Sequence, residues 1–385
     1  MKYDFLILGA DGMQGRIVAR DLLESGSAIF CADLYRAKIK RVLDQFGDNR
    51  AVFDFVDLRD VAMTTALIVK SGADVVINCG DMEWNENVYT ACLETRTHCV
   101  DLGAWIEMTE TQLTMDARFR KIKRTAITGC GSVPGIGNVM LRWAAGKFDR
   151  LESVDVGFAW DSNQKKFVVP FSMKSILEEF TYKPRMITNG RWVEKKPLET
   201  FLEREYRSIG VQRSFMVQHP ELFTFHHYYK EKGLKRVRFF AGFPNHSLEK
   251  IYALIDLGFH SEKRVKIGGT KIAPIDFLGP ALKRLRVPAG YTERENLWVE
   301  ITGRKDRKYK TILMECIVPP LPGWEDAGCN IDTGFPAVIM ARMIKNRVIT
   351  RSGSFAPEAI IPEMVFFREL AKKKLMVYEN GKKIN

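Results

Sequence analysis

The stretch that decides the fold of this chain reads Tyr3-Asp4-Phe5-Leu6-Ile7-Leu8-Gly9-Ala10-Asp11-Gly12-Met13-Gln14-Gly15. In it an apolar run passes directly into three glycines spaced three residues apart, and an amphipathic stretch follows as far as Leu23. A second apolar run then ends on the carboxylate of Asp33. This order predicts a strand, a tight turn, a helix and a second strand, which is how a dinucleotide-binding α/β domain begins.

The spacing of the three glycines predicts a cofactor site at the turn. There a pyrophosphate can approach the first turn of the helix, where free N–H groups and the helix dipole favour anions. The pattern is Gly-x-x-Gly-x-x-Gly, with Asp11 in a slot where glycine is commoner, so a turn that binds no nucleotide is the alternative. A P-loop is disfavoured because no Gly-Lys-Ser/Thr closes the loop. The residues expected to contact the cofactor are Gly9, Gly12, Met13, Gln14, Gly15, Asp33, Arg36, Asp57, Cys79 and Gly80.

The end of the second strand predicts which dinucleotide is used. The carboxylate of Asp33 can accept hydrogen bonds from a ribose diol, and it repels the 2′-phosphate of NADP. Arg36 lies three residues later and could pair with that phosphate if Asp33 turned away. We therefore expect NAD as the cofactor, with NADP as the alternative.

Length and composition indicate a globular protein of roughly two domains, because the chain has 385 residues, 46% of them hydrophobic and 28% charged. No apolar run approaches the ~18 residues that cross a bilayer, so no membrane partner is expected. The first strand leaves no room for a signal peptide, and seven cysteines without framework spacing fit a reducing compartment. We therefore expect a cytoplasmic protein. The cysteines and histidines lack the short ligand pairs of a zinc site, and no metal is expected.

The net charge of +12 is spread over segments that resemble solvated helix ends and a hairpin turn. No recognised nucleic-acid reader motif is present, so nucleic acid is not an expected partner. A positive field favours an anionic cofactor and an anionic or zwitterionic small-molecule substrate, and it disfavours a polycation unless the local charge of the pocket differs.

Residues 1–130 alternate short apolar strands with helices, which predicts a doubly wound parallel sheet, that is, a Rossmann-type domain. Strands are expected at residues 51–57, 74–79, 98–103 and 125–129, and helices at 60–70, 85–95 and 109–124. In such sheets ligands bind beyond the carboxyl ends of the strands. We therefore expect one crevice that brings together Asp33, Asp57, Cys79, Asp101 and Cys130.

The pattern changes near Leu151, and residues 131–330 predict a mixed α+β domain for substrate binding and dimerisation. Strand-like segments lie at 151–160, 210–218, 234–242, 296–302 and 309–318, with loops between the first two, and residues 246–257 predict a helix. His226 and His227 would point apart on a strand, so we expect them to be structural. Residues 331–385 are expected to return to the first domain.

The predicted antiparallel sheet would cover one face with its own helices. Its other face is expected to carry apolar side chains such as Phe239, Trp298 and Ile312, which would need a cover. A second copy of the chain would supply that cover, so we expect a homodimer.

Several segments along the chain carry a family resemblance. Besides the glycine turn they are Asp74–Asn78, His98–Gly103, Gly129–Asn138, Gln218–Thr224, Asp256–Phe259, Asp332–Ala337 and Ala356–Glu358. In this order and spacing the sequence resembles the saccharopine dehydrogenase-like superfamily, especially its lysine 6-dehydrogenase and saccharopine reductase branches. The resemblance implies a Rossmann domain interrupted by a substrate and dimerisation domain. It also implies NAD(P)-dependent oxidation or reduction at a carbon–nitrogen bond of an amino acid.

The sequence departs from this family in two places. The related enzymes have a segment like Arg-Tyr-Pro-Gly-His, where this chain reads from Arg238 through Pro244 to His246, so a carboxylate-binding role for Arg238 is weakly supported. The family often has a proline-containing loop where this chain has residues 80–84. That loop should lie near the nicotinamide, so the exact substrate stays open.

Candidate catalytic residues follow from the chemistry that amine oxidation needs. The enzyme must hold the reacting C–H over the nicotinamide, move a proton and bind the substrate carboxylate. Asp101 at a strand end, His219 and Cys130 are the expected catalytic residues, each with a structural role as the alternative. The second Gly-rich turn opens another helix, whose N–H groups could bind a carboxylate. The expected substrate-binding residues are Pro134, Gly135, Asn138, Arg238 and His246.

Three functions are compatible with these residues. The lead is an amino-acid dehydrogenase like lysine 6-dehydrogenase or saccharopine reductase. The second is a dehydrogenase that condenses a polyamine with an aldehyde, like carboxynorspermidine dehydrogenase. The third is a nucleotide-sensing protein without catalysis, which a crevice filled by Trp84 or Trp105 would support.

Overall fold

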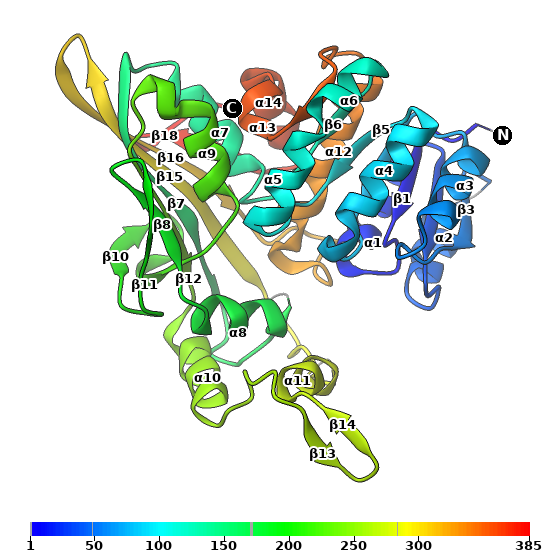
Figure 1. Ribbon diagram of the computed structural model, residues 1–385. Coiled ribbons are helices and arrows are strands. Elements are labelled where there is room, and N and C mark those ends of the chain that lie inside the picture. Colours follow the sequence, from blue (N-terminus) through cyan, green and yellow to red (C-terminus); the bar gives the residue numbers. More distant parts are fainter. Residues whose placement is uncertain (1, 48, 170–171, 283) are drawn as a thin grey trace.

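The structure is a computed structural model that describes residues 2–47, 49–169, 172–282 and 284–385. Two β-sheets stand side by side, with helices between them, and a group of helices with a small hairpin projects beyond the second sheet (Figure 1). One buried hydrophobic core runs from the first sheet through the intervening helices to the second. The prediction of a Rossmann-type domain joined to a mixed α+β domain is confirmed.

The first sheet, as described, has seven strands that all run parallel, in the order β17-β6-β5-β4-β1-β2-β3. The chain leaves β1 toward β2 on one side and later returns to β4 on the other, so the sheet has a switch point beside β1, where such sheets bind ligands. The strand bounds are β1 Phe5–Leu8, β2 Ile29–Asp33, β3 Ala51–Phe55, β4 Val75–Asn78, β5 His98–Asp101, β6 Thr125–Ile127 and β17 Gly353–Phe355.

Alternation along β1 separates the two faces of this sheet. Phe5 and Ile7 face the core that contains α1 and α12, whereas Leu6 and Leu8 face the core under α3 and α4. The helices are α1 Met13–Glu24, α2 Ile39–Phe46, α3 Val61–Ser71, α4 Asn85–Thr95, α5 Ile106–Thr114, α6 Asp116–Lys121 and α12 Ile331–Lys345. The single helix expected at residues 109–124 is therefore two helices, which break at Met115.

The second sheet has ten described strands, in the order β10-β11-β12-β7-β15-β16-β18-β19, with β8 and β9 attached beside β12. Most pairs are antiparallel, as expected, and β15 and β16 form the predicted hairpin across the basic turn. Among the described strands of this sheet, β12 and β7 are the pair that runs parallel. The bounds are β7 Arg150–Ser162, β8 Arg185–Thr188, β9 Arg191–Glu194, β10 Phe201–Tyr206, β11 Gly210–Val217, β12 Arg236–Gly242, β15 Glu293–Lys305, β16 Lys308–Val318, β18 Met376–Glu379 and β19 Lys382–Lys383.

The apolar residues expected on the outer face of this sheet divide between its two faces. Phe239 and Ile312 are fully buried in the core under the helices, so their expected placement is wrong. Trp298 belongs to a small cluster with Tyr206 and Phe240 on the other side, where Arg204 lies over its ring at 5.2 Å. That face is less apolar than the sequence indicated, and the homodimer stays a prediction.

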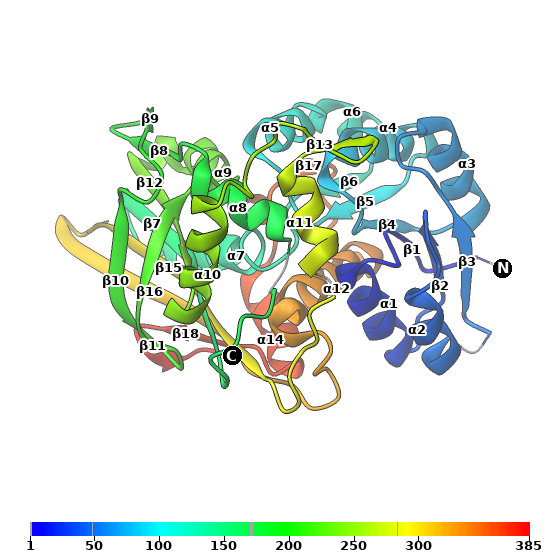
Figure 2. The same cartoon turned by 90° about the horizontal axis from the view of Figure 1, so that it is seen from below.

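Several elements in the middle of the chain differ from expectation. The segment between residues 160 and 210, expected to be loops, contains α8 Met173–Thr181 and the strands β8, β9 and β10. His226 and His227 lie on α9 Glu221–Tyr229 rather than on a strand, because Pro220 starts a helix there. The projecting group consists of α10 Asn245–Asp256, α11 Pro274–Leu282 and the hairpin of β13 Val265–Ile267 and β14 Thr270–Ile272 (Figure 2).

The C-terminal segment divides between the two sheets. Helix α12 packs on the first sheet and β17 extends it, but β18 and β19 pair with the second sheet next to β16. Between them lie α13 Pro357–Ile360 and α14 Glu363–Lys372, and α14 packs against α7 Ile136–Ala145. The expectation that the whole segment returns to the first domain therefore holds only for its first part. In the described part of the chain no helix has both the length and the apolar character to cross a membrane.

Candidate active site

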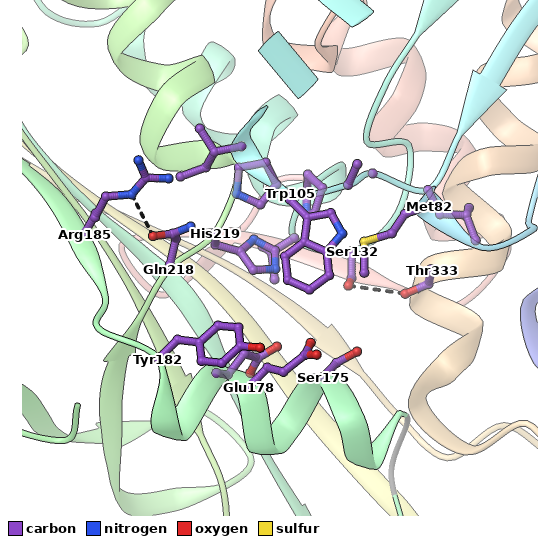
Figure 3. Close-up of a pocket in the computed structure, with 18 of the residues that line it drawn as sticks. Met82, Trp105, Ser132, Ser175, Glu178, Tyr182, Arg185, Gln218, His219 and Thr333 are labelled. Carbon is purple, nitrogen blue, oxygen red and sulfur yellow. Dashed lines mark hydrogen bonds between the residues drawn. The ribbon is translucent and has the colours of Figure 1, made fainter. Parts of the chain in front are cut away.

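A cavity of about 510 Å³ lies between the first sheet and the second (Figure 3). The first domain supplies the residues after β5, the turn before α7 and the start of α12, while α8, β8 and the segment before α9 form the opposite wall. The lining residues on which the argument rests are Met82, Trp105, Ser132, Pro134, Glu178, Glu179, Lys183, Arg185, Gln218, His219 and Thr333.

The glycine turn at residues 9–15 fits a dinucleotide. Gly9 has φ +70°, and a Cβ there would lie 2.5 Å from the backbone of Cys79, while a Cβ at Gly15 would lie 2.2 Å from the carbonyl oxygen of Gly9. These two glycines are thus required by close packing. At Gly12 an added Cβ would meet only the Gly9 oxygen, at 3.2 Å, so its outer side is open. The N–H groups in the first turn of an α-helix have no intrahelical partners, so those at the start of α1 could bind a pyrophosphate beside this turn.

Asp11 and Asp33 link the glycine turn to the end of β2. The backbone N–H of Asp11 donates to Asp33 Oδ2 at 2.8 Å, and Tyr35 N–H donates to Asp33 Oδ1 at 3.2 Å. The Asp11 carboxylate accepts the N–H groups of Lys38 at 2.6 Å and Ile39 at 2.7 Å, so it caps the start of α2. Both carboxylates lie where the adenosine ribose of a bound dinucleotide is expected.

The other predicted cofactor residues surround the same edge of the sheet. Gln14 donates to Asn330 at 3.3 Å, and Arg36 lies 5.5 Å from the Phe53 ring. Met13 is exposed at the start of α1, Asp57 forms an ion pair with Arg59, and Cys79 and Gly80 follow β4 beside Gly9. Their positions are compatible with cofactor contacts, which stay a prediction for each residue.

Asp101 does not reach the cavity and has no exposed surface. Its carboxylate accepts five hydrogen bonds, between 2.7 and 3.1 Å, from Tyr89, Gly103, Gln112, Thr128 and Gly129. Burial raises the pKa of this carboxyl. The expectation that Asp101 faces the crevice is corrected, because its carboxylate is buried and accepts hydrogen bonds from the segments that follow β5 and β6. It positions the wall that contains Gly103.

The second Gly-rich turn is closed to a substrate carboxylate. Ile136 N–H donates to the Gly131 oxygen and Gly137 N–H to the Ser132 oxygen, both at 3.0 Å, and Gly135 N–H donates to Asn138 Oδ1 at 2.8 Å. The helix N–H groups expected to bind the substrate are therefore engaged within the turn. Pro134 does line the cavity, whereas Gly135 is buried.

Two further residues near this turn are structural. Asn138 is buried and donates to Glu358 Oε2 at 2.7 Å, which fixes α7 to the C-terminal segment. Cys130 is fully buried with its thiol near the Ile127 oxygen, and burial raises the pKa of that thiol. Neither side chain can touch a ligand in the cavity, which corrects both expectations.

Arg238 and His246 also lie away from the cavity. Arg238 forms a two-point ion pair with Asp155, at 2.8 and 2.5 Å, and its side chain leaves β12 on the face opposite to Phe239. Alternation along the strand places it on the outer face, so the carboxylate-binding role expected for Arg238 is corrected. His246 lies in the first turn of α10 and does not line the cavity.

His219 is the expected catalytic residue that the structure places in the cavity. Its Nδ1 forms a hydrogen bond with Oε2 of Glu221, which is fully buried, and its ring stacks on Phe239 with 4.0 Å between centroids. These contacts fix the ring, which lines the cavity, and they involve Nδ1 and the ring face rather than Nε2 (Figure 3). Burial alone would lower the pKa of His219, but the Glu221 carboxylate outweighs it and raises that pKa above its ordinary value.

An acidic wall was missed by sequence reasoning. Glu178 and Glu179 on α8 line the cavity, and Glu194 at the end of β9 joins them. Burial raises the pKa of Glu178, and it raises the pKa of Glu179 to about 7 although the nearby His219 lowers it. The apolar spacing of Met173, Ile176, Leu177 and Phe180 was the available signal for this helix.

The cavity is open although aromatic side chains surround it. Trp105 forms part of its wall without filling it, and the hydroxyls of Ser132 and Thr333 meet at 3.3 Å on the side of the first domain (Figure 3). Because polar side chains from both domains converge on an open space, the geometry favours an enzyme over a sensor with a blocked site.

Comparisons with known proteins identify both domains. Residues 5–127 match the saccharopine dehydrogenase NADP binding domain, and residues 116–375 match the saccharopine dehydrogenase C-terminal domain. The carboxyaminopropylagmatine dehydrogenase of Synechocystis is 25% identical over 372 residues, which cover 93% of each chain. The apo saccharopine dehydrogenase (L-Glu forming) of Saccharomyces cerevisiae has the same fold, with a TM-score of 0.77, 14% identity and coverage of 100% of both chains.

These matches confirm the predictions of a nicotinamide dinucleotide cofactor, NAD or NADP, and of an NAD(P)-dependent oxidoreductase. They also confirm the resemblance on which the sequence interpretation relied. The two domain matches together span most of the chain, and the chain therefore belongs to the saccharopine dehydrogenase family.

Proposed function

We propose that this protein is an NAD(P)-dependent dehydrogenase that makes or cleaves the secondary C–N bond between a cationic amine and a carboxylated aldehyde. The observation that carries the proposal is the acidic wall formed by Glu178, Glu179 and Glu194. This wall favours the condensing reaction, the second of the three functions that the sequence allowed, over oxidation of free lysine. The name of the Synechocystis relative agrees with that choice.

The local charge of the cavity reverses the argument from net charge. The whole chain carries +12, which disfavours a polycation on average. The cavity lining, however, contains the carboxyl groups of Glu178, Glu179 and Glu194 together with Lys183, Arg185 and the imidazole of His219, and two of those carboxyl groups are adjacent on α8. Because charges within a few ångströms dominate over distant screened ones, the cavity attracts a cationic amine although the surface does not.

In the reductive direction one aldehyde, one neutral amine, NAD(P)H and one proton give a secondary amine, NAD(P)+ and water. The bound cofactor supplies the hydride. Protonated His219 suits the step in which the hydroxyl of the carbinolamine leaves as water, because it can donate that proton from Nε2 while Glu221 holds Nδ1. In the oxidative direction the same nitrogen takes the proton back.

The carboxylates of α8 would hold the cationic end of the amine. Glu179, with a pKa of about 7, is partly protonated at neutral pH and ionises when a cation arrives. Trp105 and Met82 cover the cavity from the side of the first domain and limit the access of water to the reacting carbon.

We further propose that NAD is preferred over NADP. The carboxylates of Asp11 and Asp33 are held on either side of the β2–α2 connection by backbone N–H groups. Two fixed negative charges beside the ribose would repel a 2′-phosphate. Arg36, the alternative partner for that phosphate, lies 5.5 Å from the Phe53 ring.

The test is an initial-rate assay of NADH and NADPH oxidation with paired substrates. The amines are agmatine, putrescine and lysine, each offered with an aldehyde that carries a carboxylate and with one that does not. The proposal predicts turnover with a polycationic amine and a carboxylated aldehyde. Oxidation of free lysine by NAD, with no condensation of any pair, would support the amino-acid dehydrogenase instead and reject the proposal.

A further inference from the structure

Arg185, the first residue of β8, connects the two domains at the edge of the cavity. Its Nε donates to Gln218 Oε1 at 2.8 Å (Figure 3). Its Nη2 forms an ion pair with Glu107 in the first turn of α5. No partner of Nη1 is found among the described residues. The guanidinium therefore donates from Nε to the second domain and from Nη2 to the first, and Nη1 can donate to a ligand.

Arg185 has two hydrogen-bond partners, which differ in strength, and its guanidinium also lies over the Trp192 ring at 5.3 Å. The Glu107 side chain is 64% exposed and that of Arg185 is 29% exposed, so this ion pair has the weak net energy of a surface pair. A carboxylate bound by both ends of the guanidinium inside a cavity is held more strongly, because the two charge-assisted hydrogen bonds are less screened. A ligand carboxylate can therefore replace Glu107, while Gln218 keeps the guanidinium in place.

The other charged groups near the cavity leave this role to Arg185. Lys183 is exposed, and its ammonium cannot form the two parallel hydrogen bonds that a guanidinium makes with a carboxylate. Glu194 lies opposite Arg185 in the β8–β9 register, yet no ion pair joins them among the described residues. Arg238, the residue that the sequence offered for this task, is occupied by Asp155.

We propose that Arg185 is the receptor for the substrate carboxylate and that binding transfers its guanidinium from Glu107 to the ligand. This inference rests on the proposed function. It gives the cavity two poles, with the carboxylate at Arg185 and the cationic tail at Glu178 and Glu179 of α8. The C–N bond between them then lies beside His219, so the carboxylate sets the register of the reacting atoms.

The test measures binding by calorimetry without cofactor, with two ligands that differ only in the carboxylate: carboxyaminopropylagmatine and aminopropylagmatine. Arg185→Gln should weaken the first roughly 10- to 100-fold, as expected for a lost charge-assisted pair, and leave the second unchanged. Arg185→Lys should fall between. Arg191→Gln, an equal loss of charge at an exposed position on β9, is the control and should change neither. Retained binding of aminopropylagmatine shows that each variant is folded.

Glu107→Gln tests the exchange itself. Removing the competing carboxylate should tighten carboxyaminopropylagmatine by roughly two- to fivefold and leave aminopropylagmatine unaffected, because an exposed pair is worth little. Weaker binding in this variant would show that Glu107 positions Arg185 rather than competes for it, and would overturn the exchange. Equal losses for both ligands in Arg185→Gln would overturn the receptor role. If the unmodified protein binds neither ligand, the proposed function fails as well, whereas an intact preference in Arg185→Gln rejects this inference alone.

Discussion

The turn at residues 9–15, at the carboxyl edge of the first sheet, and the segment at residues 172–188, which lines the cavity, differ in how their structure is determined. The turn closes partly on itself, since added Cβ atoms at Gly12 and Gly15 would meet the Gly9 oxygen, and Gly9 packs against Cys79, which follows the neighbouring strand β4. The segment with α8 and β8 takes its place only when β8 pairs with β12, some fifty residues further on. Under the proposed function we expect the turn to serve the cofactor and the segment with α8 and β8 to set the choice of amine.

This contrast makes a general expectation for variants. Changes in the turn should alter binding of the cofactor and leave the choice of amine alone. Changes in the α8 and β8 segment should alter the choice of amine and leave cofactor binding alone. His219 lines the cavity, and changes there should alter kcat rather than the binding of the cofactor.

The largest effect is expected for His219→Ala. Losing the general acid should lower kcat by ~10²–10⁴-fold, whereas the Kd of NADH should not change. The measurement is steady-state turnover together with a fluorescence titration of NADH. His227→Ala removes an exposed imidazole from α9 and should be silent. A loss of NADH affinity that equals the loss of rate would show that His219 binds the cofactor, and would contradict its role as the general acid.

Gly12→Val should weaken NADH at least roughly 100-fold, because the side chain enters the space needed by the pyrophosphate. The fold should survive, since an added Cβ meets only one backbone oxygen at 3.2 Å. Thermal melting with and without NADH reports both properties. Gly279→Val, at a site where a Cβ meets nothing within 4 Å, is the matched control. An unchanged NADH-induced shift in melting temperature would remove the turn from the site.

The pH dependence of the reductive rate should report His219. Its pKa lies above the ordinary value because of Glu221, and the acid form is required, so the rate should fall as pH rises through that raised pKa. In Glu221→Gln the larger raising charge is gone while that of Glu179 remains, and the falling limb should move to lower pH by roughly one unit. A profile of kcat between pH 5 and 9 measures this. A limb that stays in place would assign the titration to another group.

The smallest effect is expected at Asp33. Replacing it by alanine should narrow the ratio of NADP to NAD dissociation constants by roughly tenfold or less, since Asp11 keeps its charge nearby. Asp44→Ala, at an exposed site on α2, is the control. An unchanged ratio in Asp33→Ala would mean that other groups set the preference.

Much of the first domain was predictable because its signals are local. Apolar strands, a glycine turn and helix stops such as Gly72 specify each βα unit within about twenty residues. The site was less predictable because burial depends on contacts between distant segments. Asp101 ends a strand in the expected place, yet its carboxylate accepts hydrogen bonds from Tyr89 and Gln112 of two helices and does not reach the cavity. Arg238 has the chemistry to bind a carboxylate, but it lies on the face of β12 that points away from the core. The pairing of β12 with β7 decides which residues take that face.

The acidic wall was missed for a different reason, because the sequence contains a signal for helix α8 that the prediction did not use. The spacing of Met173, Ile176 and Phe180 is typical of an amphipathic helix, and the two adjacent glutamates follow from it. What the spacing does not contain is the direction of that helix toward the first domain. Only the packed structure shows that its carboxylates enter the cavity.

The central claim is that the carboxylates of α8 choose a cationic amine. The direct measurement is the ratio of kcat/KM for agmatine to kcat/KM for butylamine, in the unmodified protein and in the Glu178→Gln, Glu179→Gln double variant. The account predicts a ratio of at least roughly tenfold in the unmodified protein, which falls toward one in the variant while the Kd of NADH stays constant. A ratio that the double variant leaves unchanged would contradict it.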